Sequence, residues 1–457
     1  MQQRTENKMG ILPIPRLVMV MSIPIMISML VQALYNVVDS IFVAKVSENA
    51  LAAVSLAFPI QNLVIAVAVG TSIGVNSLLS RSLGAKNYED AEKAANNGIV
   101  LGFLSWAVFA VLGLTLSKYF FTLFSDNVAL QAMGSQYILV CLVFSLGIFI
   151  DVTCERILQA TGDTIHPMII QGTGAILNII LDPILIFGWF GFPALGVLGA
   201  AIATVFSQHV SACMAVYYVR KNKEVQIKTS FFKLEKRIVL SIYAVGIPTI
   251  IMQAIGTVMV MGLNKIIIAY GISAIAVLGV YFKLQSFIFM PIFGLNTGMI
   301  PVIGFNYGAK KPKRITQTVK VGLFVSVLIM IIGTAIFMLC PRFLLSWFDA
   351  SPDMLAIGIV AFPRISLCFI SAGICIVLGS LFQAIGDGYI SMIISITRQM
   401  IFLIPAAYIL GRLFGLDAIW FSFIIAELSS FLLTLLFFKS DYKKKIKPLF
   451  ALEDAQQ

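Results

Sequence analysis

Charged side chains are scarce in this chain. Only 12% of its 457 residues are Asp, Glu, Lys or Arg, whereas 59% are hydrophobic, and the mean hydropathy is +0.97. Soluble domains carry about 25% charged residues. The deficit therefore excludes a soluble protein and predicts one that crosses a membrane many times.

The residues of common enzyme and metal sites are also few or scattered. The chain has two His, with no metal-ligand spacing between them, and its six Cys lie singly, without a CxxC pair. It contains no HExxH or Walker A motif. The sequence thus predicts no enzymatic activity, no cofactor and no direct use of ATP.

Long apolar runs are what the chain has in abundance. A transmembrane helix needs about 20 apolar residues, and on this basis we predict an all-α membrane protein with twelve spanning helices. The predicted spans are 16–44, 51–80, 91–117, 131–160, 166–187, 194–219, 238–268, 273–303, 314–339, 353–382, 389–411 and 416–438.

The chain has a net charge of +11, and the positions of its basic residues indicate membrane topology. They give no indication of a nucleic-acid partner. Most of the 32 Lys and Arg lie in the tails and even-numbered loops. The positive-inside rule therefore predicts that both termini are cytoplasmic, and we expect a multi-pass protein of the plasma membrane. The exceptions in the odd-numbered loops are Lys45, Lys118, Lys265, Arg342 and Arg412, and those within spans are Arg156, Lys283, Arg364 and Arg398.

The second half of the chain repeats the first. Adding 224 to a residue number pairs Gln61 with Gln285, Gly70 with Gly294, and the Gly-Ala-Lys of 84–86 with that of 308–310. Six helices per half is an even number, so both halves share one orientation, as in transporters built from parallel repeats. We therefore predict two six-helix lobes in a V around a central cavity, related by a pseudo-two-fold axis along the membrane normal. The expected division is 1–219 for the N-terminal lobe, 220–237 for a cytoplasmic linker, and 238–457 for the C-terminal lobe with a basic tail.

The two halves differ in the polarity of their first helix. Its polar residues have the spacing i, i+3, i+4, i+7, which places them on one helical face. By the same offset they correspond to wholly apolar residues in the second half. The polar residues are Gln32, Tyr35, Asn36 and Asp39, and their counterparts are Gly256, Met259, Val260 and Leu263.

A second carboxylate lies at a similar depth in the N-terminal lobe. Asp39 and Asp182 are each about five residues from the outer end of their helices, or roughly 7 Å below the outer boundary. If they are close together, desolvation and like charge favour a shared proton. Together with the carbonyl of Asn178 they could instead bind Na⁺, because oxygen ligands suit a hard cation. The sequence leaves H⁺ and Na⁺ both open.

Other polar residues within the spans are candidates for the cavity or for ion coupling. This set comprises Gln32, Gln61, Asp151, Glu155, Lys283, Gln285 and Arg364. Glu155 precedes Arg156, which favours an ordinary ion pair. Arg398 and Glu427 lie at matching depths in neighbouring helices, which favours a structural ion pair.

Several of these segments resemble the MATE (multidrug and toxic compound extrusion) transporters, of the bacterial type with a cation site in the N-terminal lobe. They are ALYNVVDSIFV at 33–43, both Gly-Ala-Lys turns, LQATGD at 158–163, NIILDPILIF at 178–187 and LGVLGAAIAT at 195–204. The resemblance implies export of cationic, amphipathic drugs and dyes in exchange for H⁺ or Na⁺. It further implies a cation site of Asp39, Asn178 and Asp182, with Thr204, Tyr35 and Asn36 as neighbours, and no obligate protein partner.

A lipid-linked oligosaccharide flippase is the alternative reading of the same two-lobed plan. In that case Lys283, Arg364 and Arg398 would together receive a pyrophosphate. This reading requires a predominantly basic cavity, whereas the sequence places its acids in the N-terminal lobe.

Overall fold

The computed structural model describes residues 7–124, 126–227, 233–348 and 350–454, and within these ranges it contains helices and no strand. The all-α prediction is therefore confirmed. In the first half the helices are α1 (Lys8–Ile11), α2 (Ile14–Ala44), α3 (Glu48–Gly84), α4 (Tyr88–Phe124), α5 (Val128–Val143), α6 (Leu146–Ala160), α7 (Ile165–Phe187), η1 (Trp189–Gly191) and α8 (Val197–Lys221). In the second half they are α9 (Lys236–Ile267), η3 (Ile268–Tyr270), α10 (Ile272–Gly308), α11 (Pro312–Leu339), α12 (Pro341–Ser346), α13 (Pro352–Ser366), α14 (Phe369–Ile385), α15 (Gly388–Ile396), η4 (Thr397–Leu403), α16 (Ile404–Phe414), α17 (Leu416–Ile419), α18 (Phe421–Asp441), η5 (Tyr442–Ile446) and α19 (Lys447–Asp454).

Two of the twelve predicted spans are broken helices. Ten helices of the described chain are long and apolar enough to cross a membrane, and two bent pairs bring the number to twelve. The pair α5 and α6 bends by 44°, and the pair α13 and α14 bends by 46°. At each break a serine hydroxyl donates to the carbonyl three residues earlier: Ser145 to Leu142 at 2.8 Å and Ser366 to Pro363 at 3.0 Å. Such side-chain bonds replace part of the helical ladder, which explains the bends.

The internal repeat is visible in the backbone itself. Lys86 and Lys310 are 224 residues apart, and both adopt a left-handed conformation, with φ of 58° and 55°. Gly162 and Gly386 show the same offset, with φ of 98° and 99°. A positive φ is uncommon for residues other than glycine. Its recurrence at the matching lysines confirms that both halves follow the same path through these turns.

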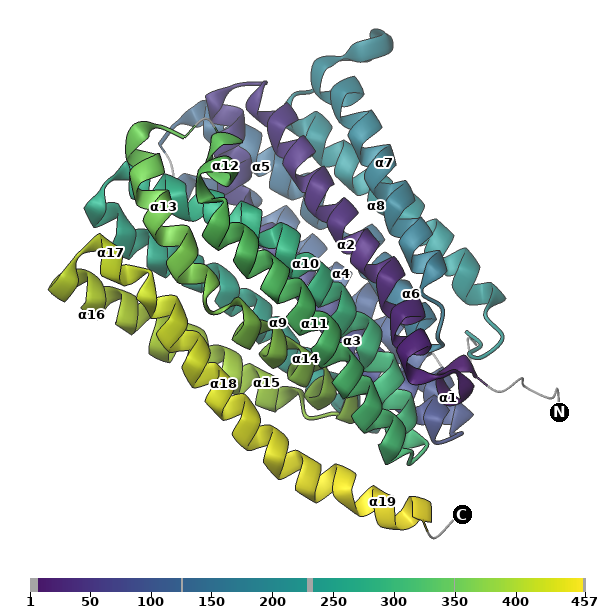
Figure 1. The fold of residues 1–457 in the computed structure, drawn as a ribbon. Helices are drawn as coiled ribbons and strands as arrows, with labels where there is room; N and C mark the ends of the chain where they lie inside the picture. The colour runs from purple at the N-terminus through teal and green to yellow at the C-terminus, as the bar shows by residue number, and fades with distance from the viewer. Residues whose placement is uncertain (1–6, 125, 228–232, 349, 455–457) are drawn as a thin grey trace.

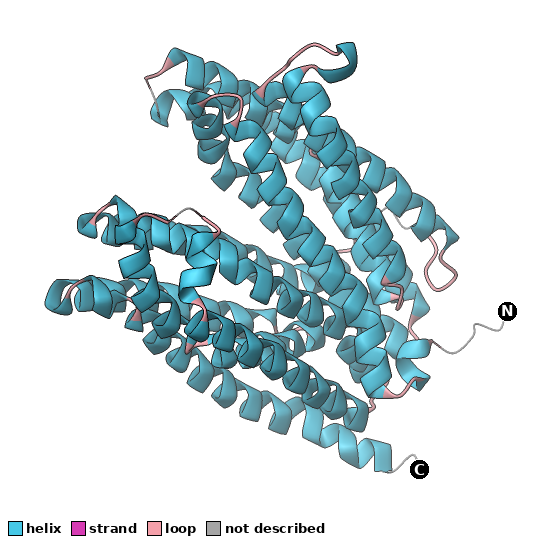
Figure 2. Ribbon diagram, turned by 45° about the horizontal axis from the view of Figure 1, so that its top comes forward, coloured by secondary structure: helices cyan, strands magenta, loops and turns pink. Residues whose placement is uncertain are grey.

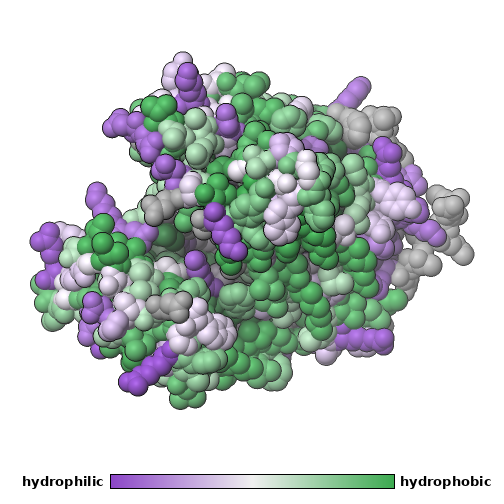
Figure 3. Space-filling view, turned by 90° about the horizontal axis from the view of Figure 1, so that it is seen from above, coloured by the Kyte–Doolittle hydropathy of each residue, from purple (hydrophilic) through white to green (hydrophobic). Residues whose placement is uncertain are grey.

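The helices form two groups that diverge at one end of the molecule (Figures 1 and 2). Both termini lie at the opposite end, where the groups are close together (Figure 2). The space-filling view from above shows a hollow between the two groups, with hydrophilic residues on the parts that flank it and a broad hydrophobic surface on the body of the molecule (Figure 3). This is the predicted V, with the apolar exterior that a bilayer requires.

Glycines allow the two groups to approach each other closely. A Cβ added to Gly294 of α10 would lie 2.6 Å from the Cα of Met26 in α2, and one added to Gly298 would lie 2.8 Å from the Cα of Ser22. The matching glycine of α3, Gly70, stands in the same relation to α9, because its Cβ would lie 2.8 Å from the carbonyl oxygen of Gly246. The helix pairs α2–α10 and α3–α9 therefore pack backbone against backbone, as small residues permit in membrane proteins.

Hydrogen bonds to backbone carbonyls reinforce this contact at the end near the termini. Ser77 Oγ of α3 donates to the carbonyl of Gln383 at 2.6 Å, and Arg81 Nη1 donates to that of Ile385 at 2.9 Å. On the other side, Asn306 of α10 donates to the carbonyl of Met9 in α1 at 3.1 Å. The V is thus closed at this end by polar contacts as well as by packing.

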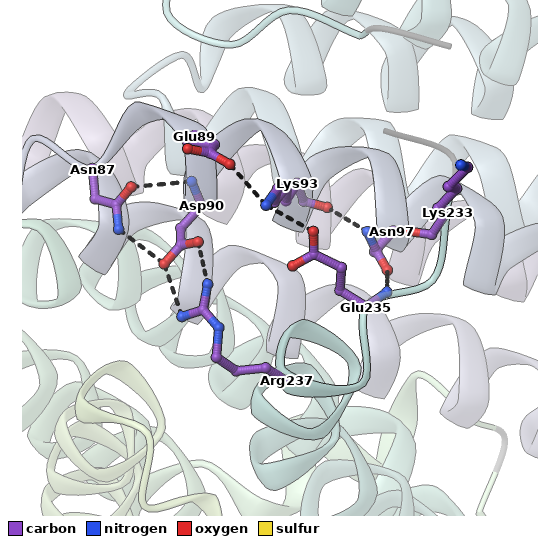
Figure 4. Close-up of polar contacts among 8 residues, drawn as sticks. All are labelled: Asn87, Glu89, Asp90, Lys93, Asn97, Lys233, Glu235 and Arg237. Atoms are coloured by element: carbon purple, nitrogen blue, oxygen red, sulfur yellow. Dashed lines mark hydrogen bonds and ion pairs between the residues drawn. The ribbon is translucent and has the colours of Figure 1, made fainter. Parts of the chain in front are cut away.

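The segment that connects α8 to α9 is tied to the start of α4 (Figure 4). Lys93 of α4 forms ion pairs with Glu89 at 2.8 Å and with Glu235 at 2.7 Å, and Arg237 pairs with Asp90. The backbone N–H of Glu235 donates to Asn97 at 3.1 Å. The connector therefore has a fixed attachment to the first group of helices, although residues 228–232 of the predicted linker 220–237 lie outside the described residues.

The close contact between α2 and α10 predicts a large effect of adding a side chain there. We expect Gly294→Val to lower the free energy of unfolding by about 1–3 kcal/mol, because the added atoms meet the Met26 backbone. Gly279→Val on the same helix is the control, since a Cβ there would have nothing within 4 Å. Thermal denaturation of the purified variants in detergent measures both. Equal stabilities for the two variants would contradict the packing described.

Candidate functional site

The predicted polar residues of α2, α7 and α8 meet in one cluster. Asn178 and Asp182 lie one turn apart on α7 and face α2, which contributes Asp39. The carboxyl groups of Asp39 and Asp182 lie within hydrogen-bonding reach of each other. Because an ionised carboxylate can only accept a hydrogen bond, a bond between these two groups requires one shared proton.

The cluster is buried and incompletely hydrogen-bonded. Asp182 is fully buried, and Asn178 is only 2% exposed. One oxygen of each aspartate, Oδ1 of Asp39 and Oδ1 of Asp182, has no hydrogen-bond partner. Buried polar atoms are normally paired, so these two oxygens indicate a place where a proton or cation is accepted.

The amide of Asn178 links Asp182 to α8. In one orientation its nitrogen lies 3.4 Å from Thr204 Oγ1. With the amide turned by 180°, the nitrogen donates to Asp182 Oδ2 at 3.3 Å, and the oxygen accepts from the Thr204 N–H at 3.2 Å. The second orientation satisfies both ends of the amide, and it is the better assignment. Thr204, which the resemblance implied as a neighbour of the cation site, thus lies directly beside Asn178.

Further polar groups lie near Asp39. Tyr35 interacts electrostatically with both aspartates. Gln61 of α3 donates to the hydroxyl of Tyr137 at 3.0 Å and to the sulfur of Cys141 at 3.5 Å. Gln61 therefore faces α5. The sequence reasoning missed Tyr137 and Cys141 as neighbours of Gln61, because α5 carries no Asp, Glu, Lys, Arg or His that would draw attention to that face.

A cavity of about 720 Å³ lies between the two groups of helices. Of the predicted residues, those lining it are Gln32, Tyr35, Asn36, Asp151, Glu155, Asn178 and Thr204. On the opposite wall lie Gly256 and Met259, the repeat counterparts of Gln32 and Tyr35, with Met252, Met290 and Phe293. Acidic residues therefore line only the wall from the first half, whereas the lining from the second half combines these apolar residues with neutral polar ones and Arg398. Asp39 and Asp182 lie just behind the wall from the first half.

Four predicted cavity residues lie outside this lining: Gln61, Lys283, Gln285 and Arg364. Arg364 instead lies 3.9 Å from Asp417 and over the ring of Phe421, and Lys283 lies 6.0 Å from the ring centroid of Phe348. Lys283 and Arg364 thus do not line this cavity, because α10 and α13 direct them toward aromatic and acidic neighbours within the second group.

Arg398 does line the cavity, and it forms an ion pair with Glu427 at 3.3 Å. Since Lys283 and Arg364 lie elsewhere, the basic cluster that a pyrophosphate would need is not formed here. The ion pair expected between Glu155 and Arg156 is also absent from the described residues. Glu155 accepts from Gln171 at 2.9 Å, and Arg156 donates to Gln159 at 2.7 Å. The sequence reasoning did not select Gln171, although it shares the face of Asn178 at a spacing of seven.

Comparison with known proteins agrees with this architecture. A family model described as MatE matches residues 24–184 and 248–409, one segment in each half of the repeat. The multidrug export protein MepA of Staphylococcus haemolyticus is 26% identical over 408 residues, which cover 89% of each chain. The probable multidrug resistance protein NorM of Thermotoga maritima is 27% identical over 423 residues, which cover 92% of this chain and 91% of that protein.

A solved structure also matches nearly the whole chain. It is described as the outward-facing conformation of a multidrug resistance MATE family transporter of the MOP superfamily, and its TM-score is 0.91 at 25% identity. The match covers 98% of this chain and 100% of that one. Since the family model also spans most of both halves, the chain belongs to the MatE family of multidrug and toxic compound extrusion transporters.

Proposed function

We propose that this transporter exports cationic or amphipathic organic compounds by antiport against H⁺ or Na⁺, with Asp39 and Asp182 as the coupling pair. The observation that supports this most directly is the proximity of two carboxyl groups, each with one buried oxygen that has no hydrogen-bond partner. Its relatives' names support the export of drugs. The proposed setting is the plasma membrane, with both termini in the cytoplasm.

Coupling follows from competition between two ligands for one conformational equilibrium. A proton shared by Asp39 and Asp182, or a Na⁺ held by their oxygens and that of Asn178, draws α2 toward α7. Without it the two carboxylates repel each other at close range. The exported compound binds in a cavity that α2 and α7 also line. In this proposal the ion stabilises one conformational state and the compound stabilises the other, and this difference couples their transport.

Alternating access is the second part of the proposal. The hollow opens at the end away from the termini (Figures 2 and 3), and the glycine contacts and the bonds of Ser77 and Arg81 close the other end. In this proposal the two lobes, taken as 1–219 and 238–457, rock about the α2–α10 and α3–α9 contacts. The opposite state would separate Arg81 from the carbonyl of Ile385 and close the hollow.

One prediction concerns the coupling pair, Asp39 and Asp182. Asp39→Asn removes a charge that the proton or Na⁺ neutralises, so we expect gradient-driven ethidium export to fall by about tenfold or more. The assay uses proteoliposomes with an imposed pH gradient and, separately, an imposed Na⁺ gradient. The gradient that drives export in the wild type identifies the coupling ion.

Glu89→Gln is the control for this experiment, because Glu89 is an exposed carboxylate on the surface where the connector attaches. It should export ethidium at the wild-type rate. Normal export by Asp39→Asn would refute the role of the pair. If the wild type moves no dye under either gradient, the proposal of drug export fails, and transport of lipid-linked sugars is the next function to test.

Another prediction concerns closure of the cavity at the end near the termini. Arg81→Ala removes a charged hydrogen bond across the lobes, worth about 1.5–3 kcal/mol, and we expect a shift of about tenfold toward the state open at that end. Distances between spin labels at Lys86 and Lys443, both exposed and in different lobes, report the shift. Arg220→Ala, an exposed arginine of α8, should leave the distance distribution unchanged. An unchanged distribution in Arg81→Ala as well would argue against this closure.

A further inference from the structure

A second acidic group faces the cavity at a distance from the coupling pair. Asp151 and Glu155 lie four residues apart on α6, and Gln171 of α7 lies beside Glu155. All three line the cavity. Gln171 precedes Asp182 by eleven residues on the same helix, which corresponds to about 16 Å along its axis. The proposed coupling mechanism does not use these residues.

This group contains acceptor oxygens without donors. Gln171 Nε2 donates to Glu155 Oε2 at 2.9 Å. Three further oxygens of the group are buried and have no hydrogen-bond partner: Glu155 Oε1, Gln171 Oε1 and Asp151 Oδ1. Glu155 itself is 1% exposed. Unpaired acceptors that face one cavity call for a ligand that supplies several N–H or O–H donors.

The neighbouring charges leave one negative charge unbalanced. Neither Asp151 nor Glu155 is within ion-pair distance of a basic group in the described parts of the chain. Arg156 is the nearest candidate, but its guanidinium donates to Gln159 at 2.7 Å. Arg398 faces the cavity from the other lobe and is paired with Glu427. With all three groups ionised, Asp151, Glu155 and Arg156 sum to a charge of minus one.

Apolar residues form part of the cavity wall near this group, alongside polar ones such as Gln208 and Ser211. The cavity beside Asp151 and Glu155 is lined by Ile65, Val69, Ile73, Ile148 and Val152. Such a wall suits the hydrophobic body of a ligand, while the oxygens take its head group. A quaternary cation would supply charge but no donors, whereas a protonated primary or secondary amine supplies both.

We propose that Asp151, Glu155 and Gln171 form a subsite for the ammonium group of an amphipathic primary or secondary amine, separate from the coupling pair. The proposal rests on the export function proposed above and specifies the head group that the cavity selects. Gln171 orients the Glu155 carboxylate through its amide N–H, and the free oxygens receive the N–H groups of the ligand.

The test compares three dyes that share one fluorophore: dansylcadaverine, which carries a primary ammonium, its N-trimethylated cation and its neutral N-acetylated form. They are titrated into the purified full-length protein in detergent, without any ion gradient, and fluorescence gives Kd. We expect the primary ammonium to bind about tenfold more tightly than the acetylated form and several-fold more tightly than the trimethylated one, because only it provides charge-assisted hydrogen bonds.

Glu155→Gln and Asp151→Asn should each weaken binding of the primary ammonium by about tenfold and leave the acetylated dye unaffected. Glu155→Gln retains an oxygen that accepts from Gln171, so it preserves the local geometry while removing the charge. Glu89→Gln at the exposed surface should bind all three dyes like the wild type. The comparison among the dyes in the wild type provides a result that does not depend on any variant.

Equal binding of the three dyes by the wild type, or no binding of any, would overturn the proposal. An ammonium preference that survives both Glu155→Gln and Asp151→Asn would also overturn it. Because this assay contains no gradient, it is independent of coupling. If the preference for the ammonium dye is absent but Asp39→Asn still abolishes gradient-driven export, only this inference is rejected. If the preference is present but Asp39→Asn exports normally, only the antiport mechanism is rejected.

Discussion

The close approach of two helix pairs, α2 with α10 and α3 with α9, is the constraint on which the rest of the structure depends. Glycines at matching positions of the repeat, Gly70 and Gly294, leave no room for a side chain between the backbones. The contact joins the two halves at one end and allows them to diverge at the other. The cavity lies between the two groups of helices that this contact joins.

The repeat provides a symmetric frame, and the chemistry departs from that symmetry. Tyr35 and its counterpart Met259 occupy equivalent places on opposite walls of the cavity, but only the first is polar. The acids gather on one side, with Asp39 and Asp182 behind the wall and Glu155 within it. On the other side Arg398 is neutralised by Glu427. A cation that enters therefore meets a polarised cavity, and any bound ion acts on only one of the two lobes.

In the two proposals made above, the acids of the first half have two separate tasks. The pair near the C-terminal ends of α2 and α7 lies behind the cavity surface, which suits a proton or a bare ion. The group on α6 lies in the cavity wall, next to apolar residues that can hold a larger body. Separation by about 16 Å along α7 allows both sites to be filled in one molecule without direct contact between their ligands.

The sequence by itself determined the spans, the repeat, and the matching depths of Asp39 and Asp182, whereas Thr204 was expected beside them only through the resemblance to the MATE transporters. Hydrophobic run length, a constant offset of 224 and helical spacing are all local or periodic signals, so they can be read without a fold. Only the tertiary structure decided which way the remaining polar side chains face. Lys283 and Arg364 turned out to be held by neighbours in their own lobe, while Gln171 joined Glu155 in the cavity. Helix rotation and the breaks near Ser145 and Ser366 set these directions, and both arise from packing between helices distant in the chain.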